Sequence, residues 1–437
     1  MNMKISQYVY FIEKKNKVLC YSTLYNEVAL ISLNAYKTIE KSLDEFKEKF
    51  PNVYSSLVAN KIIIEDEVNE IDIIRCRNKS ETFYSRNFDL TLLPSLDCNL
   101  RCWYCYEDHV RNSRMGRDVQ NNIVKLIRNK IGRKEIDSLS LNFYGGEPLL
   151  DFDDIAYPVS IALKSLCEEA GIPFSTFFTT NSTFIDDNMI HKLAELNVGF
   201  QITLDGHKEK HNKIRFKKSN QEGTYQQIID TIHKITSRIE NVFVNIRINY
   251  DEQTLQNIDG LLEDLLEIDR SKVNIHFERV WQTNTVPDNE ILKRAIYLFM
   301  MNGFKTTYVN WHPRGFACKA ECLNQAIVSY DGKVYKCTGR NFTEEHCDGI
   351  LDDDGNIQWK TGRLERRLAK ATFENPMCLA CKMLPLCMGP CSQKQIDVGS
   401  DHLRQVCSKN VLEMQMNDYI EYVCNNMLIS NQSKKYK

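Results

Sequence analysis

Between residues 88 and 304 the chain alternates apolar, strand-like runs with amphipathic helical stretches. The strand-like runs read FDLTLLPSL, LSLNFYGG, PFSTFFTTN, VGFQITLDG, VFVNIRINY and KVNIHFERV. Helical patterns such as NNIVKLIRNKIG and YQQIIDTIHKITSRI lie between them. Repeated strand–helix units of this kind form parallel sheets with right-handed crossovers. Because six units are too few for a closed eight-stranded barrel, the pattern predicts an α/β fold built on a partial (β/α)6 barrel.

Distinctive short segments follow the first four strand-like runs. In chain order they read CNLRCWYC, GGEP, TTNS and TLDG. The carboxyl ends of parallel strands meet at one edge of a sheet, where the functional groups of α/β proteins collect. We therefore expect the four segments to form one site, although the sequence assigns no catalytic acid or base. Other polar residues near predicted strand ends, each more often structural than catalytic, are His207, His211, Glu278 and Arg279.

Three cysteines form an open set. Cys98, Cys102 and Cys105 have the spacing C-x3-C-x2-C, and no fourth cysteine lies nearby. A structural zinc site closes with four ligands, whereas three thiolates can hold a cubane iron–sulfur cluster and leave one iron open. On these residues alone, a zinc site with a remote fourth ligand is the alternative. The chain has 16 cysteines, and those at short spacings indicate metal binding rather than disulfides.

CNLRCWYCY followed by FYGGEP resembles the signature of the radical S-adenosylmethionine (SAM) superfamily. The resemblance implies that Cys98, Cys102 and Cys105 bind a [4Fe–4S] cluster, whose open iron is chelated by the amine and carboxylate of SAM. It also implies SAM contacts at Tyr104, Gly145, Gly146, Glu147, Pro148, Asn181, Thr203 and Arg215. Glu147 and nearby backbone would hold the SAM ammonium group, and Tyr104 would lie near the adenine. In such enzymes an electron passed to SAM produces a 5′-deoxyadenosyl radical, which abstracts a hydrogen atom from an unactivated carbon.

A second cysteine group lies between residues 318 and 407. Eight thiols suit two fully ligated clusters or two zinc sites. Their spacing resembles the SPASM extension of radical SAM peptide-modifying enzymes, which carries two auxiliary four-iron clusters. By that resemblance the first auxiliary cluster is held by Cys318, Cys322, Cys337 and Cys391. The second is held by Cys378, Cys381, Cys387 and Cys407, so the chain would carry three [4Fe–4S] clusters.

The sequence also predicts a domain organisation. Residues 1–77 begin with a hairpin-like pattern and continue with helical stretches, which predicts a small α+β module. This module resembles the winged-helix-like domains that bind the leader peptide of a maturase substrate, and a plain packing domain is the alternative. The further predicted segments are a polar linker at 78–87, the radical SAM partial barrel at 88–304, the cysteine-rich SPASM domain at 305–412, and a C-terminal helix and tail at 413–437.

Composition excludes several partners. The net charge of −2 and the pI of about 6.5 provide no basic footprint for nucleic acid. No apolar run is long enough for a membrane span, and the N-terminal residues do not resemble a signal peptide, so we expect a cytoplasmic protein without a membrane partner. The expected partners are a precursor peptide and a low-potential electron donor, either a flavodoxin or a ferredoxin.

One position helps to choose between reactions of the SPASM group. Its sulfatase-maturing enzymes oxidise Cys or Ser to formylglycine, and in them an Asp base follows the cysteine of the G-x4-C element. Here Thr338 follows Cys337, and a hydroxyl cannot accept a proton at neutral pH as a carboxylate can. We therefore expect an oxidoreductase that crosslinks a ribosomally synthesised peptide through a thioether or carbon–carbon bond. The alternatives are a formylglycine-forming dehydrogenase and a non-catalytic, metal-stabilised peptide-binding scaffold.

Overall fold

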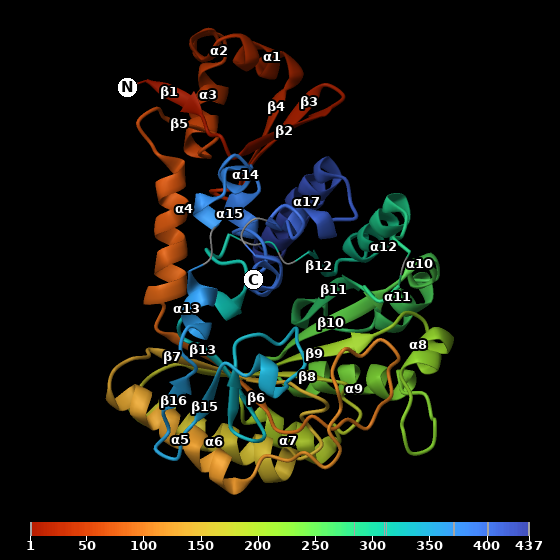
Figure 1. Ribbon diagram of the computed structural model, residues 1–437. Helices are drawn as coiled ribbons and strands as arrows, with labels where there is room; N and C mark the ends of the chain where they lie inside the picture. Colours follow the sequence, from red (N-terminus) through yellow and green to blue (C-terminus); the bar gives the residue numbers. More distant parts are fainter. Residues whose placement is uncertain are drawn as a thin grey trace. The chain divides into compact units, whose positions relative to one another are not determined.

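The chain divides into two compact units in the computed structural model (Figure 1). The structure describes residues 2–283, 285–309, 311, 313–369, 372–399 and 402–435. Unit 1 comprises residues 1–85, 310–323 and 367–437, and unit 2 comprises residues 86–309 and 324–366. Each unit therefore combines segments that lie far apart in the sequence, and the range 305–412 contributes to both.

Unit 2 is built on one 11-stranded sheet in the order β12-β11-β10-β9-β8-β7-β6-β13-β14-β15-β16. The strands that the sequence predicts are β6 (Asn87–Leu93), β7 (Ser138–Phe143), β8 (Phe174–Thr180), β9 (Val198–Leu204), β10 (Phe243–Tyr250) and β11 (Val273–Arg279). Each pairs in parallel with the next, which confirms the partial (β/α)6 barrel. The sheet is extended by β12 (Lys305–Tyr308), β13 (Gln325–Ser329), β14 (Lys333–Tyr335), β15 (Gly349–Leu351) and β16 (Ile357–Trp359).

Two of these added strands, β12 and β13, also run parallel to their neighbours β11 and β6. Both strands are short and neither belongs to a repeated strand–helix unit, so the local pattern did not predict them. The remaining three, β14 to β16, form an antiparallel extension at one edge of the sheet.

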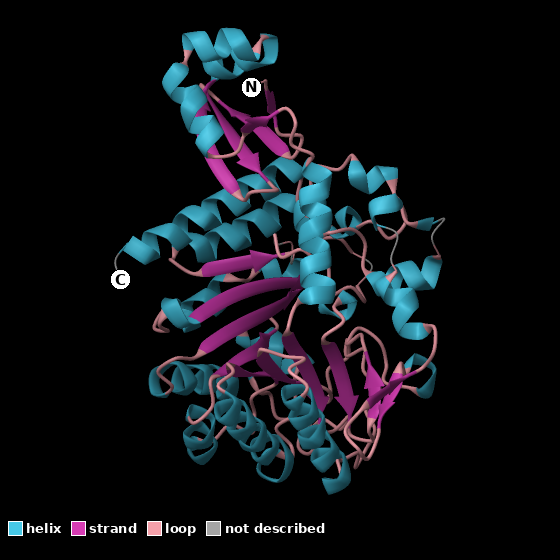
Figure 2. Cartoon of the chain, turned by 90° about the vertical axis from the view of Figure 1, so that its left-hand side faces the viewer, coloured by secondary structure: helices cyan, strands magenta, loops and turns pink. Residues whose placement is uncertain are grey.

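Helices cover one face of this sheet (Figures 1 and 2). The helical segments of unit 2 are α5 (Arg117–Gly132), η2 (Phe152–Ala156), α6 (Tyr157–Ala170), α7 (Asp187–Ala194), α8 (Lys208–Ile214), α9 (Tyr225–Arg238), α10 (Glu252–Gln256), α11 (Asp259–Leu265), η3 (Arg270–Lys272), α12 (Asn289–Met301) and η5 (Glu344–His346). The helix α13 (Arg363–Leu368) carries the chain from unit 2 into unit 1.

Alternation along the strands separates the two faces of the sheet. In β10, Ile246 and Ile248 are fully buried, while Asn245 and Arg247, which alternate with them, are partly buried. Successive side chains of a strand point to opposite faces, so the isoleucines lie on the helix-covered face and the polar residues on the other. The polar face is therefore the one that can receive a ligand.

Unit 1 contains the N-terminal module. An antiparallel sheet of order β2-β3-β4 and a short β1-β5 pair carry its strands. Its elements are β1 (Met3–Ile5), β2 (Val9–Lys14), β3 (Lys17–Ser22), β4 (Glu27–Ser32), α1 (Leu33–Lys41), α2 (Leu43–Lys49), α3 (Pro51–Ala59), β5 (Ile63–Glu65) and α4 (Glu70–Lys79). The predicted hairpin is β2–β3. The helical stretch is divided at Ser42, whose hydroxyl accepts a hydrogen bond from the N–H of Glu45 at 3.3 Å and so begins a new helix.

The segment 78–87, for which we predicted a linker, is mostly helical. The helix α4 continues into a π-helical turn, η1 (Ser80–Tyr84). The Thr82 hydroxyl donates to the carbonyl of Asn78 at 2.6 Å, and Asn78 donates to the carbonyl of Gly315 at 2.8 Å. These contacts tie the segment to a later part of unit 1, which the local polar composition did not indicate.

The rest of unit 1 is made of short helices and one long helix. They are η4 (Lys319–Glu321), η6 (Thr372–Glu374), α14 (Pro376–Leu379), α15 (Leu384–Cys387), α16 (Ser392–Val398), η8 (Ser408–Val411) and α17 (Met416–Lys435). In α17 the side chains of Tyr419, Ile420 and Tyr422 are buried, as expected for a packing helix. Within the described residues, no helix is both long and apolar enough to cross a membrane.

Candidate active site

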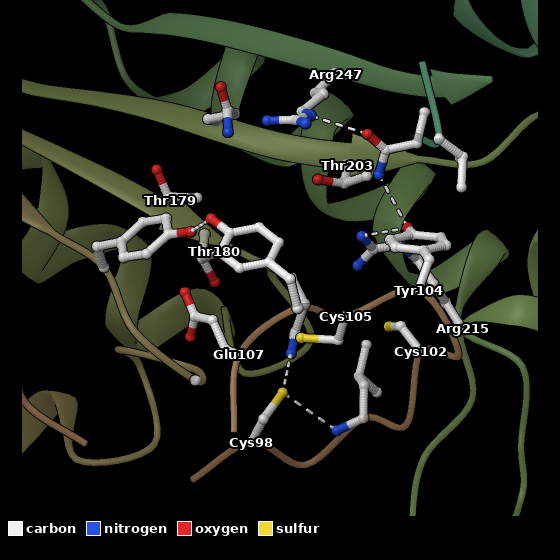
Figure 3. Close-up of a pocket in the computed structure, with 18 of the residues that line it drawn as sticks. Cys98, Cys102, Tyr104, Cys105, Glu107, Thr179, Thr180, Thr203, Arg215 and Arg247 are labelled. Atoms are coloured by element: carbon white, nitrogen blue, oxygen red, sulfur yellow. Dashed lines mark hydrogen bonds between the residues drawn. The ribbon is translucent and has the colours of Figure 1, made fainter. Parts of the chain in front are cut away.

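A pocket of about 170 Å³ opens where the strands of unit 2 end (Figure 3). Its walls come from the loop after β6, the ends of β7 to β10, and the segment after β11. The residues predicted from the sequence that line it are Cys98, Cys102, Cys105, Tyr104, Gly145, Gly146, Asn181, Thr203 and Arg215. Glu147 and Pro148 are buried and do not line it.

Hydrogen bonds from backbone and side-chain groups hold the loop that carries the three cysteines. The N–H of Cys98 donates to the Asp97 carboxylate at 2.8 Å. The sulfur of Cys98 accepts hydrogen bonds from the N–H of Leu100 at 3.4 Å and from the Asn181 amide at 3.8 Å. Hydrogen bonds to sulfur stabilise a thiolate, which is the form that binds metal.

The donor set fits a cluster. Burial raises the pKa of Cys98 to about 12 and also raises the pKa values of Cys102 and Cys105, so a strong cation is needed to keep these thiols ionised. In the described part of the chain, no three His, Cys, Asp or Glu side chains converge closely enough to hold one metal ion. A zinc ion would need its sulfur ligands about 4 Å apart. Three thiolates on one short loop suit a cluster, in which each thiolate binds a different iron.

Two consecutive glycines let the end of β7 approach the cysteine loop. Gly145 has a φ of +112°, and a Cβ there would lie 2.6 Å from the carbonyl oxygen of Ser95. A Cβ on Gly146 would lie only 2.0 Å from the carbonyl oxygen of Asp97. The N–H of Glu147 donates to that same oxygen at 2.8 Å. Glycine is therefore required at both positions by close backbone packing.

The carboxylate of Glu147 is engaged inside the protein. It accepts hydrogen bonds from the Thr180 hydroxyl at 2.6 Å, the Asn181 N–H at 2.7 Å and the Leu149 N–H at 3.0 Å. Burial nevertheless raises the pKa of Glu147 to about 7. These bonds join the ends of β7 and β8, and the contact to a SAM ammonium group stays a prediction.

A buried polar network fixes Tyr104 between two of the cysteines. Its hydroxyl donates to the Asp205 carboxylate at 2.6 Å and accepts from Arg215 at 2.8 Å and from the Asn249 amide at 2.9 Å. Arg215 also pairs directly with Asp205 at 2.7 Å. Asp205 and Arg215 are both buried, and the Asp205 carboxylate compensates the charge of the Arg215 guanidinium inside the protein. The network ties the cysteine loop to β9, β10 and α8.

Several pocket residues escaped the sequence analysis. The hydroxyls of Tyr106 and Tyr144 hydrogen bond to each other, and Tyr106 also donates to the carbonyl of Thr338 at 3.3 Å. Burial raises the pKa of Glu107 to about 7, and Glu107 hydrogen bonds to Tyr144. The position that follows Cys337 therefore lies beside the pocket. Tyr144 directly precedes the two glycines, which is a signal that could have identified it.

The strands supply further polar residues. Gln201 and Thr203 on β9, and Arg247 and Asn249 on β10, line the pocket. Arg247 donates from Nε to the Asn249 side chain at 2.8 Å. Their spacing of two residues within apolar strands was visible in the sequence, since such an alternation marks one face of a strand.

The histidine and glutamate near the predicted strand ends differ in their surroundings. His211 is fully buried, accepts from the Asp205 N–H at 3.2 Å and hydrogen bonds to Thr224 at 3.1 Å, so it is a structural residue. Glu278 hydrogen bonds to His276 at 3.1 Å. Arg279 lines the pocket, whereas His207 does not.

Four of the later cysteines lie together in unit 1. Burial, followed by the fields of Cys381, Cys378 and Cys407, raises the pKa of Cys387 to about 12. The Cys387 sulfur also accepts a hydrogen bond from the N–H of Gly389 at 3.4 Å. These four thiols are the set predicted for the second auxiliary cluster, and their proximity is compatible with that assignment.

The other four later cysteines are divided between the units. Cys318, Cys322 and Cys391 belong to unit 1, and Cys337 belongs to unit 2. Burial lowers the pKa of Arg314, while the nearby thiols of Cys318 and Cys322 oppose this effect. The Cys337 sulfur accepts from the N–H of Gly339 at 3.3 Å. The first auxiliary cluster stays a prediction.

Comparison with known proteins identifies the domain around the pocket. Residues 92–265 match the sequence model of the Radical SAM superfamily. The cysteine-type anaerobic sulfatase-maturating enzyme of Clostridium novyi (strain NT) is 22% identical over 329 residues, which cover 69% of this chain and 86% of that protein. The radical SAM cyclopropyl synthase TigE of Paramaledivibacter caminithermalis is 20% identical over 422 residues, 86% of this chain and 80% of its own.

Solved structures share the fold. The enzyme anSMEcpe with bound AdoMet and Cp18Cys peptide aligns with a TM-score of 0.55 at 19% identity, over 80% of this chain and 100% of its own. Streptococcus suis SuiB bound to precursor peptide SuiA aligns with a TM-score of 0.50 at 16% identity, over 91% and 98% of the two chains. Together with the family match, these similarities set aside the non-catalytic scaffold.

Proposed function

This chain is a radical SAM enzyme, and we propose that it modifies a ribosomally synthesised peptide by joining two of its side chains. The observation that carries the proposal is the pocket itself, where three cysteine thiols, a glycine pair and a polar strand face meet at one edge of a parallel sheet. The curated relatives and the structural neighbours named above include enzymes whose names or bound ligands concern proteins or peptides.

The cluster side of the pocket is assigned to Cys98, Cys102 and Cys105. When bound there, a [4Fe–4S] cluster and SAM would supply a 5′-deoxyadenosyl radical for hydrogen-atom abstraction. The chain's own residues orient these groups: the glycine pair lets the loop approach, and Tyr104 is held in place by its hydrogen bonds. The remaining predicted SAM contacts are Asn181, Thr203 and Arg215. They also line the pocket, and we propose them as SAM contacts.

The absence of a carboxylate after Cys337 favours crosslinking over formylglycine formation. The carbonyl of Thr338 accepts a hydrogen bond from the pocket residue Tyr106, so this position borders the pocket. Its hydroxyl cannot serve as the base that an aspartate would provide. Formation of a crosslink removes two hydrogen atoms from the peptide. One leaves on 5′-deoxyadenosine, and the other leaves as a proton and an electron.

That electron needs an acceptor, and iron–sulfur clusters held by the later cysteines would provide it. We assign Cys378, Cys381, Cys387 and Cys407 to one auxiliary cluster and Cys318, Cys322, Cys337 and Cys391 to another. Clusters at these positions would take up the substrate electron and pass it on. A flavodoxin or ferredoxin would supply the electron that begins each turnover.

The formylglycine alternative is supported by one pocket residue. Glu107 is a carboxyl group whose burial raises its pKa to about 7, which suits a general base near neutral pH. The sulfatase-maturating names of several relatives point the same way. The two reactions differ in their products, since formylglycine formation leaves an aldehyde on one side chain, whereas a crosslink joins two side chains and leaves no aldehyde.

The N-terminal module is the proposed docking site for the peptide leader. Of the two edge strands in the β2-β3-β4 sheet, β2 is partly covered, because Lys382 donates to the carbonyl of Val9 at 2.8 Å. The outer edge of β4 pairs with no strand among the described residues, and Leu30 on it is 57% exposed. A free edge of this kind can accept a peptide as an added strand.

Anaerobic reconstitution tests the enzyme class first. Iron and sulfide would be counted per chain, then dithionite and SAM added and 5′-deoxyadenosine measured. About twelve irons with nucleoside formation would support the three-cluster radical enzyme. Mass spectrometry of co-expressed candidate peptides then separates the reactions: a loss of two hydrogen atoms without hydrazine reactivity supports crosslinking, and an aldehyde that reacts with hydrazines supports formylglycine. Zinc in place of iron, with no nucleoside, would refute both.

A further inference from the structure

Arg247 on β10 is one of the charged residues that line the pocket, together with Arg215 and Arg279. It lies on the polar face of β10, between Asn245 and Asn249 at the neighbouring positions of that face. Both asparagines make hydrogen bonds through their neutral side-chain amides. The Asn245 oxygen accepts from the Asn274 amide at 2.7 Å, and the Asn249 amide donates to the Tyr104 hydroxyl at 2.9 Å. Arg247 therefore differs from both neighbours on this face in carrying a charge.

Two of the arginines that line the pocket, Arg215 and Arg247, have different partners. Arg215 forms an ion pair with the buried Asp205. Arg247, by contrast, makes a hydrogen bond only from Nε to Asn249, and no carboxylate among the described residues lies within ion-pair distance of it. A partly buried guanidinium without a counter-ion is costly, and a bidentate carboxylate is the partner that best offsets this cost.

Glu278 on the adjacent strand does not fill that role. Its carboxylate hydrogen bonds to His276 at 3.1 Å. Burial opposes ionisation of Glu278, and the His276 bond together with the charge of Arg247 holds its pKa below the usual value. Arg247 therefore acts on Glu278 only through space, and its terminal amino groups stay available to a ligand.

The place of Arg247 separates it from the cofactor. In Figure 3, Arg247 lies on the opposite side of the pocket from Cys98 and Cys102. A SAM molecule that chelates a cluster iron through its amine and carboxylate keeps that carboxylate beside the cysteines. An anion bound at Arg247 would therefore belong to a second molecule.

We propose that Arg247 binds the carboxylate of an aspartate or glutamate side chain in the peptide substrate and so determines which residue enters the pocket. This inference rests on the proposed function and adds a substrate class to it. The adjacent Asn249 amide and the Gln201 side chain provide neutral hydrogen-bonding groups around the anion. The aromatic rings of Tyr106 and Trp281, whose centroids lie 6.4 Å apart, provide apolar contact for the neighbouring peptide residues.

The test is equilibrium binding by the anaerobically reconstituted full chain. The probes are three capped pentapeptides, acetyl-Gly-Ala-X-Ala-Gly-amide, in which X is Glu, Gln or Lys. Affinities are measured by anaerobic calorimetry or saturation-transfer NMR, with and without saturating SAM. The variants are Arg247→Gln, Arg247→Glu and the control Arg128→Gln, an exposed arginine on α5. Circular dichroism verifies that each variant is folded.

The Glu peptide is expected to bind about tenfold or more tightly than the Gln peptide, and to do so with SAM present. Arg247→Gln should abolish this preference, Arg247→Glu should turn it toward the Lys peptide, and Arg128→Gln should keep it. Equal affinity for Glu and Gln peptides, or no binding of either at millimolar concentration, overturns the inference. Displacement of the Glu peptide by SAM overturns it too, because Arg247 would then hold the SAM carboxylate. These outcomes are independent of nucleoside and product formation, which test the proposed function.

Discussion

Replacing Gly146 by alanine should disable the cluster site through backbone packing alone. The added Cβ would lie 2.0 Å from the carbonyl oxygen and 2.5 Å from the carbonyl carbon of Asp97, where contacts under 3.0 Å essentially never occur. The obstacle is backbone, so no side chain can rotate away. The loop that carries Cys98 would have to move by about 1 Å to restore an allowed contact.

The cost of that movement follows from the bonds it breaks. The Gly146 N–H donates to Ser95 at 3.2 Å, and the Glu147 N–H donates to Asp97 at 2.8 Å. Loss of both, at about 1 kcal/mol each, adds to about 1–3 kcal/mol for overpacking, so we expect about 3–5 kcal/mol of local destabilisation. A misplacement of about 1 Å in a reacting group lowers rates by about 100-fold, and the same loss is expected for 5′-deoxyadenosine formation.

The assay is anaerobic reconstitution of Gly146→Ala beside a matched glycine variant. Gly132→Ala is the control, because a Cβ at Gly132 on α5 meets nothing within 4 Å. That control should keep its iron and activity and gain up to about 1 kcal/mol of stability. Gly146→Ala should lose about one third of the iron and the electron paramagnetic resonance signal of the SAM cluster. A Gly146→Ala protein with full iron content and normal nucleoside formation would refute the packing argument.

Three further predictions concern single polar groups. Asp205→Asn should lower the free energy of unfolding by about 3–5 kcal/mol in urea titrations, because it leaves Arg215 buried without its charged partner. The control is Asp259→Asn, which removes an exposed ion pair with Arg294 and should lower that free energy by at most about 1 kcal/mol. Burial lowers the pKa of His211 to about 3, so below pH 6.5 the unfolded chain binds a proton that the folded chain does not. The free energy of unfolding should therefore fall by about 2 kcal/mol from pH 6.5 to 5. The His211→Gln variant should not show this pH-dependent loss. The Nε2 atom of His109 lies 3.6 Å from the sulfur of Cys105. Loss of this hydrogen bond in His109→Ala should lower the midpoint potential of the bound cluster by about 40 mV in a redox titration. An unchanged potential would count against the hydrogen bond.

Much of the fold could be predicted from local patterns. The six strand-like runs became β6 to β11 because each combines period-two apolar residues with a turn signal at its end, and both properties are local. The motif segments CNLRCWYC, GGEP, TTNS and TLDG meet at one edge because the parallel arrangement of consecutive strands requires it. Local composition failed at 78–87, where contacts with Gly315 and neighbouring residues support a helix in a polar segment.

The chemistry between the motifs was decided by tertiary structure. The spacing of Cys98, Cys102 and Cys105 indicates a metal cluster without knowledge of the fold, since all three thiols lie on one short loop. Neither the pairing of Tyr106 with Tyr144 nor the compensation of Arg215 by Asp205 can be read from a linear pattern. Those residues come from different strands and loops, and their separations depend on strand register and packing.

The sequence by itself thus determined the parallel sheet, the cysteine motif and the edge at which the site forms, because these depend on short-range periodicity and spacing. Only the tertiary structure decided that Glu147 is occupied by internal hydrogen bonds while Arg247 faces the pocket without a carboxylate partner among the described residues. The physical reason is that a charge is compensated or left available by groups that are brought near it through folding, whatever their distance along the chain.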